Sequence, residues 1–133
     1  MDIIVTRTIK KRELNGTVSE EARKLFAKLK DRPEIAVGIS SPGLPARTTL
    51  HKVYATTEGG ARRLLFFCRH TPASTPPATD RWVLLFYRNT ADAVGKNMTS
   101  KNAEFTRQLA KNLQAAVDDL AASKPNDSQF ELF

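Results

Sequence analysis

Two apolar stretches bordered by arginine decide the fold of this chain. Residues 59–67 read Gly-Gly-Ala-Arg-Arg-Leu-Leu-Phe-Phe, and residues 81–89 read Arg-Trp-Val-Leu-Leu-Phe-Tyr-Arg-Asn. Short apolar runs of aromatic and branched residues are typical of buried strands. Because both alternating sets of side chains are apolar, we predict that these two strands are central in a sheet. The arginines at their ends indicate that the sheet meets an anion, with a nucleic-acid backbone favoured over a small metabolite.

Further elements are predicted on either side of these stretches. Together with them, alternation and turn residues predict four strands, at residues 2–9, 48–57, 61–70 and 81–89. A basic amphipathic helix is predicted over 17–32, because Thr17 and Glu20 fit a capping box and Pro33 disfavours helix before it. A second helix is predicted from residue 99 or 100 to residue 122, with apolar residues at spacings of three and four. Residues 33–47 and 71–80 are predicted to be irregular connections.

This order of elements predicts an α+β fold. We expect a small, largely antiparallel sheet of about four strands with the helices packed on one face. A chain of 133 residues is sufficient for one domain, which we assign to residues 1–123. Residues 124–133 are expected to form a flexible C-terminal tail.

The excess of positive over negative charge is confined to the first half of the chain. Residues 1–70 contain 14 Lys and Arg against 7 Asp and Glu, whereas residues 71–133 contain 7 of each. The net charge of +7 therefore predicts a basic face and an acidic partner such as RNA, DNA or an acidic polypeptide. A solubilising surface without any partner is the alternative interpretation.

Several classes of function find no support in the sequence. Cys68 is the single cysteine and is expected to be a buried, inert thiol. His51 and His70 are the only histidines, and no carboxylates accompany them at metal-ligand spacing, so neither a metal nor another cofactor is predicted. No signal peptide, membrane-spanning run or phosphate-binding glycine motif is present, which favours a cytoplasmic protein.

The arginines of the two central strands are the best candidates for a functional site. Antiparallel pairing predicts that Arg88 lies near Arg62 or Arg63 and forms a cationic rim suited to phosphate. The alternative is that these arginines extend from the margin of the sheet into water alone.

The same residues resemble the RelE/HigB group of toxins from toxin–antitoxin systems. The resemblance rests on Gly59-Gly60-Ala61-Arg62 before one strand, on Phe86-Tyr87-Arg88-Asn89 at the end of the next, and on a leucine-rich last helix; it covers roughly residues 52–122. Members of the group often carry an acidic residue where Thr90 stands. They also usually carry a second N-terminal helix, which residues 33–47 do not supply.

The resemblance implies a RelE-like fold and a small endoribonuclease that cleaves messenger RNA on the ribosome and is held by a cognate antitoxin. Cleavage would use the ribose 2′-hydroxyl as the nucleophile, with arginine stabilising the transition state. The catalytic candidates are Arg62 and Arg88, followed by Arg63, Tyr87 and His70; Tyr87, Tyr54 and His70 are the candidates for proton transfer. Because side chains alternate along a strand, Arg88 and Tyr87 are expected to face opposite sides of the sheet. The residues expected to bind ribosomal RNA are Lys10, Lys11, Arg12, Lys24 and Lys28.

Three other functions remain open on the sequence. A ParE-like relative would act on a protein target such as gyrase and would need no proton shuttle. A non-catalytic nucleic-acid-binding domain would use the same basic charge for salt-sensitive binding. A phage or plasmid domain with an unrelated role is the third alternative.

Overall fold

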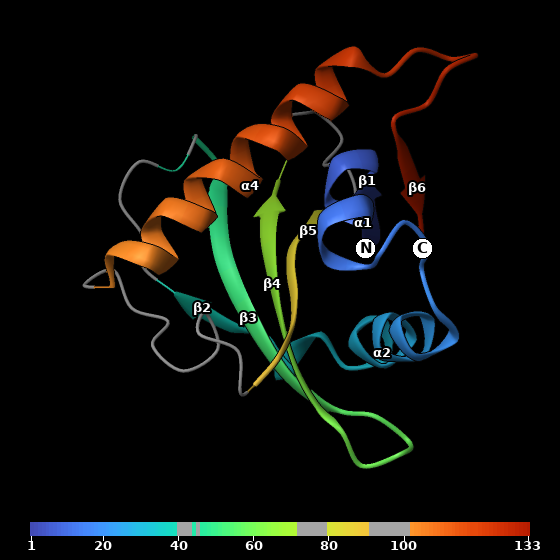
Figure 1. Ribbon diagram of the computed structural model, residues 1–133, viewed down its shortest axis with the longest axis vertical. Helices are drawn as coiled ribbons and strands as arrows, with labels where there is room; N and C mark the ends of the chain where they lie inside the picture. The colour runs from blue at the N-terminus through green and yellow to red at the C-terminus, as the bar shows by residue number, and fades with distance from the viewer. Residues whose placement is uncertain (40–43, 45, 72–79, 91–101) are drawn as a thin grey trace.

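The computed structural model describes residues 1–39, 44, 46–71, 80–90 and 102–133 (Figure 1). Its elements follow the order β1 (Asp2–Thr6), α1 (Arg7–Glu13), α2 (Glu20–Asp31), the 3-10 turn η1 (Pro33–Ile35), β2 (Val37–Ile39), β3 (Thr48–Thr56), β4 (Arg62–His70), β5 (Arg81–Asn89), α4 (Ala103–Ala122) and β6 (Phe130–Leu132). The fold is therefore α+β, as the sequence predicts. The interior of the loop expected at 71–80 and the expected helix start at 99 or 100 lie outside the described residues.

The strands form one mixed sheet in the order β2-β3-β4-β5-β1-β6. β2 to β5 are antiparallel neighbours, whereas β1 pairs in parallel with β5 and antiparallel with β6. The sheet has six strands where about four were expected, because the short edge strands β2 and β6 were not predicted. β4 and β5 lie in the middle of the sheet, which confirms their predicted central position.

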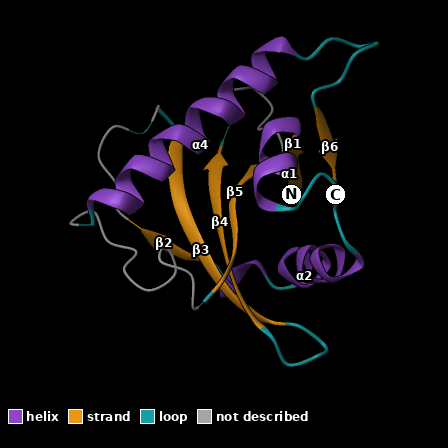
Figure 2. Cartoon of the chain, viewed as in Figure 1, coloured by secondary structure: helices purple, strands orange, loops and turns teal. Residues whose placement is uncertain are grey.

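Helices cover both faces of the sheet, so the expected one-sided packing is wrong (Figure 2). Phe66 and Phe67 are adjacent in β4 and point to opposite faces. Phe66 packs against Phe105 of α4 at a ring distance of 5.4 Å, whereas Phe67 packs against Phe26 of α2 at 6.3 Å. We call these the α4 face and the α2 face. The sequence contained the signal for this, because β4 and β5 are apolar on both faces, which is the pattern that two-sided covering requires.

The N-terminal segment contains a helix where a strand was expected. β1 ends at Thr6, and α1 follows at once and packs on the α4 face. Ile9 is the single buried residue of α1, so no apolar stripe marks the helix in the sequence. Lys10, Lys11 and Arg12 occupy its last turn, where positive charge is favourable near the negative end of the helix dipole.

The other two long helices match their predicted apolar faces more closely than their predicted starts. α2 begins after Ser19, whose hydroxyl accepts a hydrogen bond from the Ala22 amide at 3.1 Å, so the cap is not Thr17. The side-chain oxygen of Asn102 caps α4 by accepting hydrogen bonds from the amides of Glu104 and Phe105. The predicted ends of both helices are confirmed.

The C-terminal segment joins the sheet instead of forming a separate tail. β6 pairs with β1, and the Phe133 ring lies 5.5 Å from Phe26 of α2. Arg23 lies over the Phe133 ring, and Lys30 donates a hydrogen bond to the Phe133 carbonyl oxygen at 3.1 Å. Polar residues at 124–129 obscure this in the sequence, because the apolar residues that dock come only at the end.

Candidate functional site

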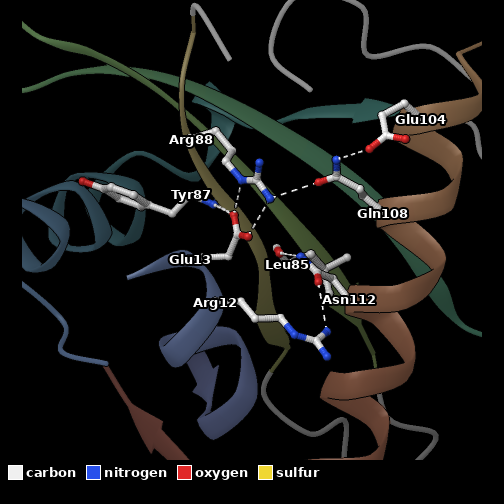
Figure 3. A network of polar contacts seen from close by, with 8 residues as sticks. All are labelled: Arg12, Glu13, Leu85, Tyr87, Arg88, Glu104, Gln108 and Asn112. Atoms are coloured by element: carbon white, nitrogen blue, oxygen red, sulfur yellow. Dashed lines mark hydrogen bonds and ion pairs between the residues drawn. The ribbon is translucent and has the colours of Figure 1, made fainter. Parts of the chain in front are cut away.

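The alternation of β4 and β5 separates the predicted site residues into two groups. Arg88 pairs across the sheet with Leu64, two residues beyond Arg62. Arg62, Leu64 and Arg88 therefore point to the α4 face, whereas Arg63 and Tyr87 point to the α2 face. The prediction that Arg88 and Tyr87 face opposite sides is confirmed, as Figure 3 shows. Of the arginines expected in a cationic rim, Arg62 and Arg88 therefore share a face, and Arg63 lies on the other one.

Arg88 is fixed by a carboxylate that the sequence analysis did not identify. Its Nε and Nη2 donate to Glu13 of α1 at 2.6 and 2.8 Å (Figure 3). The Glu13 side chain is only 1% exposed, and it also accepts a hydrogen bond from the Tyr87 amide at 3.0 Å. Two charge-assisted bonds to one carboxylate determine the orientation of the guanidinium plane. Arg88 keeps 24% of its side chain exposed, so part of it remains accessible to a ligand.

Gln108 connects Arg88 to α4. Its side-chain oxygen accepts a bond from Arg88 Nη2 at 3.1 Å, and its amide nitrogen donates to Glu104 at 2.7 Å (Figure 3). Asn112, one helical turn further along, donates to the Leu85 carbonyl at 2.8 Å and is 4% exposed. α1, β5 and α4 therefore meet around one guanidinium group.

A second part of the α4 face carries the side chains next to Arg62. Lys52 and Tyr54 of β3 pair with Phe66 and Leu64, which places them on this face. Tyr54 is 56% exposed, and the Lys52 ammonium lies 5.4 Å from the centre of its ring. A hollow of about 340 Å³ adjoins them and is lined by Tyr54, Ala55, Thr56, Arg62, Arg63 and Thr90. Arg62, Lys52 and Tyr54 thus offer charge and a phenol hydroxyl on the face that carries Arg88.

Arg63 and Tyr87 belong to a network on the other side of the sheet. Arg63 donates to both carboxylate oxygens of Glu21 in α2, at 3.1 and 3.3 Å, and Tyr87 donates its hydroxyl to the same carboxylate. The Tyr87 hydrogen bond, aided by Arg63, lowers the pKa of Glu21 although burial acts against it. Burial and the Glu21 charge together raise the pKa of Tyr87 above its usual range. This tyrosine therefore stays protonated and anchors α2, a poor arrangement for proton transfer.

His70 lies at the far end of β4 from Arg62. The two are eight positions apart in one strand, which corresponds to roughly 26 Å at about 3.3 Å per residue. His70 pairs with Arg81 and Thr48, and its Nδ1 lies 3.3 Å from the Thr48 hydroxyl. One phosphate cannot contact both Arg62 and His70, so the structure does not support His70 as part of the rim.

The five residues expected to bind RNA also divide between the two sides of the sheet. Lys10, Lys11 and Arg12 lie on α1, and Lys10 forms a 2.6 Å ion pair with Glu131. Lys24 and Lys28 of α2 line a hollow that also contains Glu20, Glu21 and Glu58. Because three carboxylates accompany two lysines there, the α2 hollow is not strongly positive.

The chemistry available to the site is that of anion binding. Among the described residues, no group of three or more His, Cys, Asp or Glu could hold a metal ion. Cys68 is buried, and burial raises the pKa of its thiol to about 11, so it stays protonated at neutral pH. No described helix is both long and apolar enough to cross a membrane. On the α4 face, the fixed Arg88 guanidinium and the exposed Arg62 are cations that can bind an anion.

Sequence reasoning missed Glu13, Gln108 and Asn112. Glu13 and Arg88 are 75 positions apart, and the helix that carries Glu13 was expected to be strand and turn. The available signal was a carboxylate within an otherwise basic segment, where a buried acid needs a cationic partner. Asn112 could have been found as a polar residue within the apolar stripe of the last helix.

The chain was also compared with protein-family models, curated proteins and solved structures. None of these three comparisons finds a match.

Proposed function

We propose that this chain is a RelE/HigB-type toxin of a toxin–antitoxin module, with a RelE-like fold, that cleaves messenger RNA at the ribosome. The observation that carries the proposal is the placement of Arg62 and Arg88 on one face, with Arg88 oriented by buried Glu13. Members of this group usually carry a second N-terminal helix, and the presence of both α1 and α2 upstream of residue 33 supports the proposal.

The proposed reaction needs little from the protein except position and charge. The RNA 2′-oxygen forms a bond to phosphorus and loses its proton, while the bond from phosphorus to the 5′-oxygen breaks and that oxygen gains a proton. The products are a 2′,3′-cyclic phosphate and a free 5′-hydroxyl. Arg62 and Arg88 would stabilise the charge on the phosphate oxygens in the transition state. Of the proton-transfer candidates Tyr87, Tyr54 and His70, Tyr54 is the one that lies next to Arg62.

The partners required are the ribosome with its message and a cognate antitoxin that covers the basic face, in the cytoplasm. Inducible expression tests the proposal. We expect the parent chain to arrest growth and shorten messages. Folded Arg62→Ala or Arg88→Ala should cleave RNA at least about 10² times more slowly, and should no longer arrest growth. Arg32→Ala is a matched control, because Arg32 is exposed beyond the end of α2 and pairs only with Glu34 in the described residues. Absence of arrest would refute the toxin assignment.

One observation favours the non-cleaving alternatives, a ParE-like toxin or a nucleic-acid-binding domain. Tyr87 and His70 lie away from Arg62, and Arg88 already has a carboxylate partner. Arrest with intact messages and DNA damage would indicate the ParE-like function. RNA binding without either effect would indicate the binding domain.

A further inference from the structure

A polar groove continues from Arg88 away from Arg62, between α1 and α4. Its volume is about 340 Å³, and its lining residues are Arg12, Glu13, Arg88, Arg107, Gln108, Lys111 and Asn112. Arg107, Gln108, Lys111 and Asn112 recur at intervals of one and four along α4, so they form one helix face. Arg88 belongs to both this groove and the rim with Arg62.

The charge of the groove is positive because its single carboxylate is already used. Glu13 is 1% exposed and is bound by Arg88 and the Tyr87 amide. Arg107 pairs with Glu104 outside the lining. Within the described part of the chain, neither Arg12 nor Lys111 forms an ion pair, and both are exposed. Two positive charges therefore remain available at the mouth of the groove.

Asn112 gives this arrangement a defined geometry. Its amide nitrogen is bound to the Leu85 carbonyl of β5, which leaves its side-chain oxygen facing α1. Arg12 donates to that oxygen across a long 3.4 Å contact (Figure 3). A neutral oxygen directs the guanidinium without cancelling its charge. A stronger acceptor such as a phosphate oxygen can displace so weak a bond.

We propose that this groove binds the phosphodiester next to the one held by Arg62 and Arg88, with Arg12 and Lys111 as the contact residues. This inference rests on the proposed function, which makes an RNA strand the molecule that lies in the groove. The ligand is a single-stranded nucleic-acid backbone, because none of the lining residues is apolar or aromatic. A protein partner needs an apolar interface core, and base readout by stacking needs aromatic side chains. Binding here is therefore independent of sequence.

Salt-dependent binding of a short 2′-O-methyl RNA, which lacks the attacking hydroxyl, tests the groove separately from cleavage. Each phosphate contact on a single strand contributes about 0.7 to the slope of log affinity against log salt concentration. We expect Arg12→Ala/Lys111→Ala to reduce the slope by about 1.4 for two unrelated sequences and for single-stranded DNA. The control Lys30→Ala/Arg32→Ala removes the same charge from exposed positions around the end of α2 and should leave the slope unchanged.

Three results would overturn the groove: an unchanged slope in the Arg12/Lys111 variant, an equal loss in the control, or no salt-dependent binding by the parent chain. Groove-dependent binding of a poly-glutamate peptide without groove-dependent binding of the oligonucleotide would also overturn it, in favour of an acidic protein partner. Cleavage of unmodified RNA by the same preparations is scored independently. A chain that binds through the groove and does not cut refutes the ribonuclease and leaves the groove in place. A chain that cleaves RNA while the groove variants bind normally supports the ribonuclease and refutes the groove.

Discussion

Each face of the sheet carries an arginine paired with a glutamate, but the two pairs differ in how they are buried. On the α2 face, Arg63 and Glu21 are 22% and 34% exposed and are joined by the Tyr87 hydroxyl. On the α4 face, Arg88 is 24% exposed, whereas the side chain of its partner Glu13 is 1% exposed. The first arrangement shares its charges with water and anchors a helix. The second buries the acid, so the exposed part of the pair belongs to the cation.

Removal of the buried acid should have the largest effect. Glu13→Ala would leave the partly buried Arg88 charge and the Tyr87 amide without their acceptor. We expect a loss of about 3 kcal/mol in the free energy of unfolding, measured by urea denaturation. Glu21→Ala, on the more exposed side, should cost less, about 2 kcal/mol, because water screens its pair with Arg63. Equal losses would show that the two pairs do not differ in the way their burial indicates.

Loss of the tyrosine hydroxyl comes next. Tyr87→Phe keeps the ring and removes only the bond to the Glu21 carboxylate. A hydrogen bond to a charged group contributes about 1.5 kcal/mol, and we expect a loss of that size in urea unfolding. RNA cleavage should persist in this variant, because Tyr87 lies on the α2 face. If the cleavage rate of Tyr87→Phe falls as far as that of Arg88→Ala, Tyr87 takes part in catalysis and this prediction is wrong.

These two predictions depend on residues that the sequence revealed to different degrees. The bounds of β5 and nearly those of β3 and β4 follow from their apolar pattern, because each strand spans the core and little else could form there. Arg62 and Arg88 were found because they end those strands. Glu13 was not found, because its role depends on a contact between segments 75 positions apart. Local patterns carry no information about which distant helix settles on which face.

The pH dependence of stability should come from the α2 side. The pKa of Glu21 is lowered from 4.5 in the folded protein, chiefly by Tyr87, so its contribution is present above pH 4.5 and is lost as the pH falls below it. The pKa of Tyr87 is raised from 10.0, so its contribution is present below pH 10.0 and is lost above it. Urea unfolding across pH should therefore show both slopes in the parent chain. Tyr87→Phe should weaken both the alkaline and the acidic slope, and unchanged slopes would contradict the assignment.

The smallest effect is expected at an exposed pair on the rim of the α2 hollow. Lys24 and Glu58 are 49% and 79% exposed and 2.9 Å apart. Exposed pairs contribute little because water screens them and their side chains lose freedom. Lys24→Ala should therefore unfold at the same midpoint as the parent chain in thermal denaturation. A clear decrease in that midpoint would show that the α2 hollow has a structural role comparable with the Arg63 network.

The position of β1 between β5 and β6 has a consequence for how the chain folds during synthesis. β1 emerges from the ribosome first, but Ile4 pairs with Val83 on one side and Leu132 on the other. At about 5–20 residues per second, the second of these partners follows only after roughly 6–26 seconds. Until β5 appears, α1 has no sheet on which to place Glu13. Arg88 is therefore held only late in synthesis, and a nascent chain carries its basic segments for seconds before the site exists.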